Sequence, residues 1–187
     1  MILYLHGFNS SPQSHKAQVM GRYMAERGMA GEYACPALPP LAGDALREIE
    51  KLNPGASTCF LGSSLGGFYA TYLAEKHGAR AVLINPAIEP HVGLRAYLGP
   101  QKNLHGGEPY QLTEAHLREW EKLYVQRLTP QRYLLLVETG DEVLDYRQAL
   151  ERYAGAEQVV IQGGDHSLQS FPRHLSRILE FCRAATV

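Results

Sequence analysis

The stretch that decides the fold of this chain covers residues 57–67 and reads STCFLGSSLGG. An apolar run ends in this stretch, and a pattern typical of a helix begins. Between them, Gly62 and Gly66 lie two residues to either side of Ser64, which is the Gly-x-Ser-x-Gly spacing of a very tight strand-to-helix turn. Such a turn leaves no room for Cβ atoms at its flanking positions and lifts its central hydroxyl above the sheet edge. The spacing therefore predicts that Ser64, and not Ser63, is a nucleophile.

The rest of the chain alternates between short apolar runs and helical patterns. The predicted strands cover residues 1–5, 33–35, 57–61, 79–84, 133–138 and 158–162. The predicted helices cover residues 14–27, 42–52, 65–77, 146–153 and 172–182. Strands that alternate with helices predict the α/β class, here a doubly wound, mainly parallel six-stranded sheet covered on both faces. No linker or internal repeat interrupts residues 1–187, so a single domain is expected.

One interval breaks this alternation. Residues 89–128 separate two predicted strands by about three times the length of an ordinary crossover, so an insertion is expected there. Thr113 is the predicted N-cap of a helix that runs to about Leu128, and glycines and prolines interrupt the residues before it. We interpret this insertion as a helical lid. The alternative is a decorative excursion of the chain.

A serine nucleophile needs a base and an acid, which in this type of sheet follow it along the chain. His166 lies on a short loop after the last predicted strand and is the expected base. The acid is expected just beyond the strand 133–138, where Asp141, Glu142 and Asp145 are candidates. We choose Asp141 because it lies on the turn at the strand end. Asp145 is instead placed to cap the next helix, and Glu142 is expected to be a solvated charge.

The loop after the first predicted strand supplies the other half of the site. A glycine at its start allows the loop to fold over the serine, so the backbone N–H groups of Phe8 and Leu65 are the predicted oxyanion donors. Asn9 and Ser10 follow directly and are predicted to line the substrate pocket. Turn formation is the alternative role for these two residues.

Composition and charge exclude several classes of protein. The 187 residues are 45% hydrophobic and 20% charged, which is ordinary for a globular chain with a buried core. The formal net charge is -1 and no basic cluster is interleaved with aromatics, so no nucleic-acid partner is expected. The first apolar stretch has no basic leader and is too short for a signal peptide or a membrane span. We therefore expect a soluble cytoplasmic protein.

The three cysteines show no paired spacing. Cys35, Cys59 and Cys182 are an odd number, and neither a disulfide framework nor a zinc site is indicated. We expect them to be reduced and mostly to serve in packing.

Several blocks of the sequence together resemble the α/β-hydrolase superfamily, and more closely the small YqiA-type esterases. These blocks are residues 4–12, 61–70, 85–87, 139–146 and 163–167. They follow one another in the family's order and span nearly the whole chain. The resemblance implies a trimmed α/β-hydrolase fold that lacks the first two strands of the larger fold, with strands ordered 2-1-3-4-5-6. It also implies esterase activity that extends to acyl-CoA thioesters.

The expected function is that of a carboxylesterase or acyl thioesterase that forms an acyl-Ser64 intermediate. The expected partner is a small acyl ester or thioester, and no metal or organic cofactor is expected. One alternative is a serine peptidase or amidase on the same residues; no dedicated acidic pair for a substrate amine is found, but charges such as Glu138 leave this alternative open. A second alternative is a non-catalytic binding module of the same fold. The complete set of Ser64, His166 and Asp141 argues against it.

Overall fold

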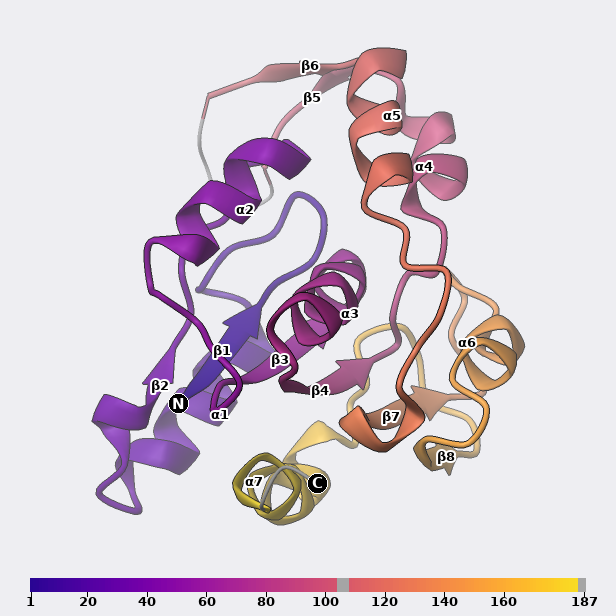
Figure 1. Ribbon diagram of the computed structural model, residues 1–187. Coiled ribbons are helices and arrows are strands. Elements are labelled where there is room, and N and C mark those ends of the chain that lie inside the picture. Colours follow the sequence, from indigo (N-terminus) through magenta and orange to yellow (C-terminus); the bar gives the residue numbers. More distant parts are fainter. Residues whose placement is uncertain (104–107, 185–187) are drawn as a thin grey trace.

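The computed structural model describes residues 1–103 and 108–184. Its centre is a six-stranded parallel sheet with the strand order β2-β1-β3-β4-β7-β8 (Figure 1). The strands are β1 (Ile2–Leu5), β2 (Tyr33–Ala34), β3 (Cys59–Ser63), β4 (Arg80–Ile84), β7 (Tyr133–Glu138) and β8 (Glu157–Ile161). The predicted class and strand order are confirmed. The order reverses between β1 and β3, and open parallel sheets bind ligands at such a switch point.

Helices cover both faces of this sheet. They are α1 (His15–Ala25), α2 (Ala42–Glu50), α3 (Leu65–His77), α4 (Pro90–Gly93), α5 (Glu114–Lys122), α6 (Tyr146–Arg152) and α7 (Leu175–Arg183). One face packs against α1 and α7 through residues such as Met20 and Ile178. The other packs against α2, α3 and α6 through residues such as Ile49 and Leu73. Because both faces are buried, the central strands are continuous apolar runs rather than alternating ones.

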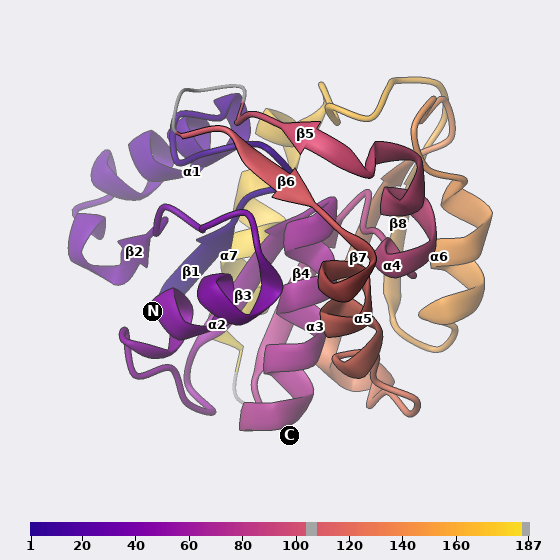
Figure 2. The ribbon, with the colours of Figure 1, turned by 90° about the horizontal axis from the view of Figure 1, so that it is seen from above.

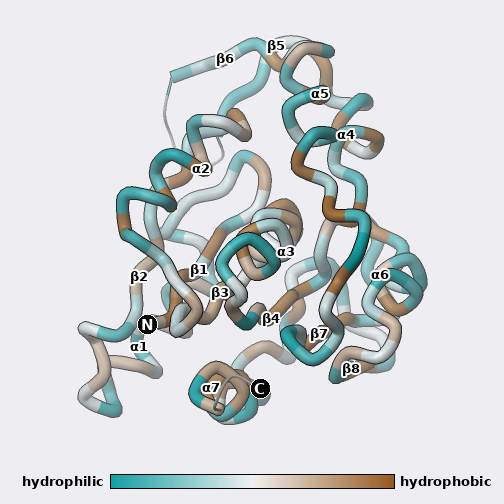
Figure 3. The backbone as a smooth tube through the Cα atoms, in the orientation of Figure 1, coloured by the Kyte–Doolittle hydropathy of each residue, from teal (hydrophilic) through white to brown (hydrophobic). Residues whose placement is uncertain are grey.

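Hydropathy follows these layers. Figure 3 shows hydrophobic segments along the central strands, while the outward-facing turns of several helices are hydrophilic. Within the described part of the chain, no helix combines the length and the apolar character needed to cross a bilayer.

The insertion is only partly helical. It contains α4, α5 and, between them, an antiparallel hairpin of β5 (Gly99–Gln101) and β6 (Tyr110–Leu112) that was not predicted. In the sequence, Pro100 is a turn signal rather than a strand signal. Within sheets, proline is confined to edge strands such as β5, to strand starts and to bulges. Figure 1 and Figure 2 show the hairpin and α5 on the side of the sheet that carries α2 and α3.

The predicted C-terminal end of α5 is wrong. The helix begins after its predicted N-cap, Thr113, but ends at Lys122 instead of near Leu128. The carbonyl oxygens of Val125 and Gln126 accept hydrogen bonds from the Arg152 guanidinium. Arg152 therefore satisfies two backbone acceptors of the segment that follows the helix, which no helical N–H reaches.

Helix α5 is part of the hydrophobic core. Its Leu117 and Trp120 side chains are fully buried, and the Trp120 Nε1–H donates to the Tyr69 hydroxyl of α3 at 2.8 Å. Release of this helix from the body would expose Trp120 and break a buried hydrogen bond. Any lid motion must therefore involve other parts of the insertion.

The expectation of reduced cysteines is wrong for two of the three. Cys59 and Cys182 form a disulfide, with their Cα atoms 5.3 Å apart, while Cys35 is free. Cys59 begins β3 and Cys182 lies near the end of α7, which packs on the same sheet face. Their separation of 123 residues hides this proximity in the sequence.

Candidate active site

Ser64 occupies a strained turn between β3 and α3. Its backbone angles are φ 55° and ψ -120°, a combination that is rare for a residue with a side chain. A Cβ atom on Gly62 would overlap the carbonyl of Gly66, and one on Gly66 would overlap the carbonyl of Leu5. The two glycines are therefore required by close backbone approach. The strain is held by three backbone hydrogen bonds of 2.9–3.0 Å at Ser64, one from its N–H and two to its carbonyl.

The two adjacent serines differ in exposure. Ser63 is the last residue of β3 and is buried, whereas Ser64 is partly exposed at the end of the strand. Only Ser64 therefore combines the elbow conformation with access to a bound molecule.

His166 and Asp141 lie in contact. His166 Nδ1 lies 2.8 Å from Asp141 Oδ2, and the side chain of Asp141 is 1% exposed against 23% for His166. Since an ionised carboxylate only accepts hydrogen bonds, Nδ1 carries the proton and Nε2 is left as the acceptor. The carboxylate is thus enclosed, while the imidazole still reaches solvent.

The pKa of Asp141 lies below its ordinary value. Burial by itself raises the pKa, but hydrogen bonds from His166 and from the N–H groups of Leu144 and Val143 outweigh burial. Asp141 is therefore ionised at neutral pH, as a partner that stabilises an imidazolium needs to be.

The other candidate acids have different partners. The Oδ1 atom of Asp145 accepts the N–H of Arg147 at 3.0 Å and caps α6, as expected from the sequence. Glu142 is not a purely solvated charge, because its Oε2 accepts the backbone N–H of His166 at 3.0 Å. Of the three carboxylates, only Asp141 bonds to the imidazole.

The predicted oxyanion donors come from two segments that lie beside Ser64. A Cβ atom added to Gly7 would lie 3.3 Å from the Cβ of Ser64 and 3.7 Å from its Oγ, so the loop after β1 passes directly over this serine. Leu65 is the first residue of α3, and its N–H has no acceptor within the helix. The fold thus brings the Phe8 segment and the start of α3 to the same hydroxyl.

The side chain of Asn9 is engaged by the insertion. Its Nδ2 donates to Gln101 Oε1 at 3.0 Å, and its Oδ1 accepts the Tyr110 hydroxyl at 2.7 Å. The carbonyl of Ser10 accepts the Asn103 amide at 2.6 Å. Both Asn9 and Ser10 line a small cavity of about 10 Å³ beside the loop. The predicted pocket residues therefore join the loop after β1 to the insertion.

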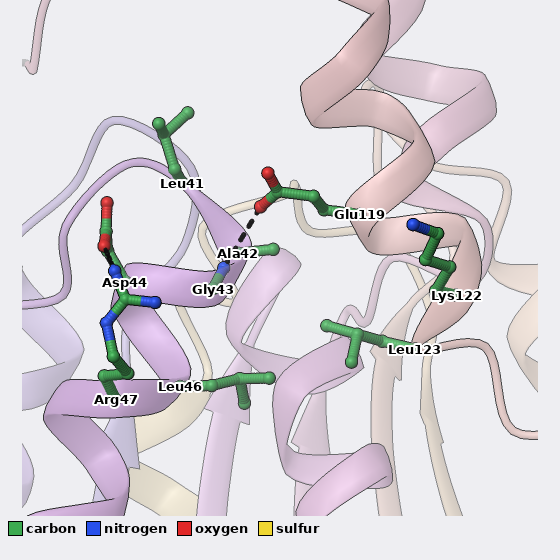
Figure 4. A pocket seen from close by; sticks show the side chains of 9 residues that line it. All are labelled: Leu41, Ala42, Gly43, Asp44, Leu46, Arg47, Glu119, Lys122 and Leu123. Carbon is green, nitrogen blue, oxygen red and sulfur yellow. Dashed lines mark hydrogen bonds and ion pairs between the residues drawn. The ribbon is translucent and has the colours of Figure 1, made fainter.

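A larger groove of about 400 Å³ lies elsewhere, between α2 and α5 (Figure 4). Within it, Glu119 accepts the N–H of Gly43 and Asp44 pairs with Arg47. None of the residues that line it belongs to the Ser64, Asp141 and His166 set.

The sequence interpretation gave two buried polar residues at the site no part in holding the base, because Asn85 stood only in a block of the resemblance and Glu138 was considered only as a charge for a substrate amine. Asn85 follows β4 and Glu138 ends β7, and they are 2% and 1% exposed. Both contact the loop that carries His166. A polar residue at the end of a buried strand is the signal that could have found them, but its partners lie far along the chain.

Comparison with known proteins places the chain in a family. The uncharacterised protein family UPF0227 matches residues 1–183. The chain belongs to the UPF0227 family. A UPF0227 protein of Citrobacter koseri is 25% identical over 186 residues, which cover 97% of this chain and 98% of the relative. The UPF0227 protein YcfP of Salmonella gallinarum is 26% identical over 188 residues, with the same coverage of both chains.

Solved structures show that this UPF0227 protein has the α/β-hydrolase fold. The mouse α/β hydrolase domain-containing protein 10 aligns with a TM-score of 0.69 at 17% identity, over 96% of this chain and 87% of its own. Est1E of Butyrivibrio proteoclasticus, bound to ferulic acid, aligns with a TM-score of 0.68 at 14% identity, over 96% and 86%. The esterase domain of a Rhodothermus marinus protein gives 0.65 at 20% identity, over 95% and 83%.

Proposed function

We propose that this protein is a serine hydrolase that cleaves carboxylic esters or acyl thioesters through an acyl-Ser64 intermediate. The observation that carries the proposal is the meeting of three strand ends at one sheet edge. Ser64 follows β3, Asp141 follows β7 and His166 follows β8, and the last two are joined by the 2.8 Å hydrogen bond. Because these strands are parallel, their carboxyl ends lie on the same side.

The proposed reaction has two halves, the acylation of Ser64 and the hydrolysis of the acyl-enzyme, and His166 acts in both. His166 Nε2 accepts the proton of Ser64 as Oγ attacks the acyl carbon, and Asp141 stabilises the imidazolium. The backbone N–H groups of Phe8 and Leu65 hold the developing oxyanion. The imidazolium then protonates the departing alcohol or thiol. A water molecule, deprotonated by His166, attacks the acyl carbon, and the imidazolium returns this proton to Ser64 Oγ as the bond to Oγ breaks and the carboxylic acid leaves.

Two observations favour esters and thioesters over peptides. Glu138, the acidic residue that left a peptidase open, is buried and its carboxylate is bonded to backbone and side-chain donors of the His166 loop. It is therefore not placed to bind a substrate amine. Proteins of similar fold include an esterase domain and an enzyme bound to ferulic acid, a small carboxylic acid.

We also propose that the lid is narrower than the whole insertion. Helix α5 is anchored by the buried Trp120, whereas the β5–β6 hairpin is joined to the oxyanion loop through exposed or half-buried side chains such as Asn9, Gln101 and Tyr110. In this proposal, β5 and β6 are therefore the part of the insertion that controls entry to Ser64.

The test is labelling with a fluorophosphonate probe, combined with turnover of p-nitrophenyl esters and acyl-CoAs of graded acyl length. Ser64→Ala should abolish labelling and lower kcat by a factor on the order of 10³ to 10⁶, while Ser63→Ala retains most activity. Equal loss in both variants would contradict the assignment of the nucleophile. Turnover of peptides without esters would support the peptidase alternative, and a folded protein that neither labels nor turns over substrate would support the binding module.

A further inference from the structure

The loop that carries His166 is only partly held by hydrogen bonds within itself, such as the one from the Leu168 N–H to the Asp165 carbonyl at 3.1 Å. Residues 162–170 link β8 to the final helical segment without helix or strand, and Leu168 has a positive φ of 50°. Catalysis by a general base requires the imidazole to be fixed within a fraction of an ångström. Other backbone groups of this loop, among them the N–H groups of Asp165, His166 and Ser170, find partners elsewhere in the protein.

Glu138 accepts hydrogen bonds from donors of this loop. Its Oε2 accepts the N–H of Asp165 at 2.8 Å, and its Oε1 accepts the N–H and the hydroxyl of Ser170 at 3.2 and 2.5 Å. These residues lie on both sides of His166. A Cβ atom on Gly164 would overlap the Glu138 carboxylate, so the loop approaches this side chain as closely as a backbone can.

Asn85 donates hydrogen bonds to carbonyl oxygens of the same loop. Its Nδ2 donates to the carbonyl oxygens of Asp165 and His166 at 3.2 and 3.1 Å. Its Oδ1 accepts the backbone N–H of Glu138 at 3.1 Å, which joins the two residues to each other. Every polar atom of the Asn85 side chain is thus used, and the amide that bonds His166 is fixed by the sheet.

The same position is connected to the nucleophile. The residue before Asn85 is Ile84, whose carbonyl accepts the N–H of Ser64 at 3.0 Å. One strand end therefore sets the backbone of both Ser64 and His166, although these residues lie about a hundred positions apart.

We propose that Asn85 and Glu138 are positioning residues for His166, forming a buried clamp that sets the imidazole relative to Asp141 and Ser64. The expected effect on kcat rests on the proposed function, whereas the positioning of the imidazole does not. Both residues act through the loop and touch neither substrate nor the reacting atoms. Disruption of the clamp is expected to lower kcat, because the base loses its position, while KM and substrate binding change little.

The chain contains a matched control. Glu75 also accepts several hydrogen bonds from a loop, including the N–H of Thr129 at 2.6 Å and its hydroxyl at 3.0 Å, but at the amino end of β7. Glu75 lies on α3 and also pairs with Arg132, but Glu75→Gln and Glu138→Gln both remove a carboxylate that accepts hydrogen bonds from a loop, near opposite ends of β7. Thr129→Val and Ser170→Ala are the milder pair, since each removes only a hydroxyl donor to the respective carboxylate.

The experiment compares kcat, KM and melting temperature for these four variants and for Asn85→Ala. Glu138→Gln and Asn85→Ala should lower kcat roughly 10- to 100-fold, with KM within about twofold of wild type. Ser170→Ala should show a smaller loss in the same direction, and it reports on the clamp even if the stronger variants fail to fold. Glu75→Gln and Thr129→Val should lower the melting temperature without a comparable loss of kcat. Equal kcat losses in both sets, or no loss in the clamp set, would refute the proposal.

A second readout does not depend on turnover. The His166 Nδ1 proton that bonds Asp141 should give a low-field proton NMR resonance, assigned by its loss in Asp141→Asn. We expect this resonance to disappear or broaden in Glu138→Gln and Asn85→Ala and to persist in Glu75→Gln. If wild-type protein shows the resonance but hydrolyses no ester, the proposed function fails while the clamp stands. If the resonance persists in the clamp variants, the clamp fails independently of any activity.

Discussion

Asp141 and Asp145 differ by four positions, and the structure gives them separate partners. Asp141 bonds the imidazole of His166, whereas Asp145 bonds Arg147 at the start of α6. Asp141→Asn keeps the size but presents an N–H donor to Nδ1, which favours the wrong tautomer. We expect kcat to fall by a factor on the order of 10² to 10⁴ with KM little changed. Asp145→Asn, the matched control, should change mainly the melting temperature. A larger kcat loss in Asp145→Asn would reverse the two roles.

Local signals made some of these residues predictable from the sequence. Gly62 and Gly66 are required by close backbone approach around Ser64, and their spacing within a window of five residues is a recognisable signal of this turn. The acid could be chosen because Asp141 lies three residues past a strand end. The role of Asn85 and Glu138 could not be predicted in this way, because their hydrogen-bond partners lie 27 to 81 positions away and only the folded sheet brings them together.

At the level of elements, β5 and β6 are joined to the loop after β1 by two hydrogen bonds of the Asn9 side chain, to Gln101 and to Tyr110. Tyr110→Phe removes the hydroxyl that Asn9 Oδ1 accepts at 2.7 Å. The loss of one such bond, about 1 kcal/mol, should loosen the loop and lower kcat by roughly fivefold, with KM for a small ester unchanged. Hydrogen exchange in residues 99–103 and 108–112 should become faster. Tyr23→Phe, on α1, is the control.

An effect on KM alone would contradict the role of Tyr110 in holding the loop. If Tyr110→Phe and Asn9→Ala raise KM and leave kcat unchanged, Asn9 binds the substrate directly, which is the role first predicted from the sequence. The hairpin itself escaped sequence interpretation because its strands have only three residues each and one contains Pro100. By contrast, β7 and α3 were predicted at their observed bounds, since β7 is buried along its length and α3 along most of it.

At the scale of the whole molecule, carboxylates with lowered pKa values link stability to pH. Burial by itself raises the pKa of Glu75, but hydrogen bonds from Thr129 and Tyr133 and the charge of Arg132 lower it below its ordinary value. The pKa of Asp141 is also lowered. A depressed folded-state pKa adds stability above the unfolded-state value, about 4, and this stability is lost as the pH falls through the folded-state value.

The expected result is a free energy of unfolding that is level near neutrality and decreases below about pH 4. Urea unfolding at pH values from 7 to 3 measures it. Glu75→Gln should be less stable than wild type at neutral pH and should lose less stability on acidification. A free energy that increases on acidification would have the wrong sign for these carboxylates.

The disulfide connects the start of β3 to the end of the last helix and so constrains most of the chain. Cys59 and Cys182 are separated by 123 residues, and closing a loop of this length removes much of the entropy of the unfolded state. The chain-entropy estimate is about 4 to 5 kcal/mol at 25 °C. Reduction should therefore lower the melting temperature markedly, and Cys182→Ser should reproduce the effect while Cys35→Ser does not.

Thiol titration in denaturant provides the count that this prediction requires. Of the three cysteines, one should react before reduction and all three after it, because only Cys35 is free. Cys59 lies on the strand that leads to Ser64, so loss of the bond should also loosen the packing of α7 beneath that strand. Three reactive thiols in air-oxidised protein, together with a melting temperature that reductant does not change, would show that the two cysteines only pack against each other.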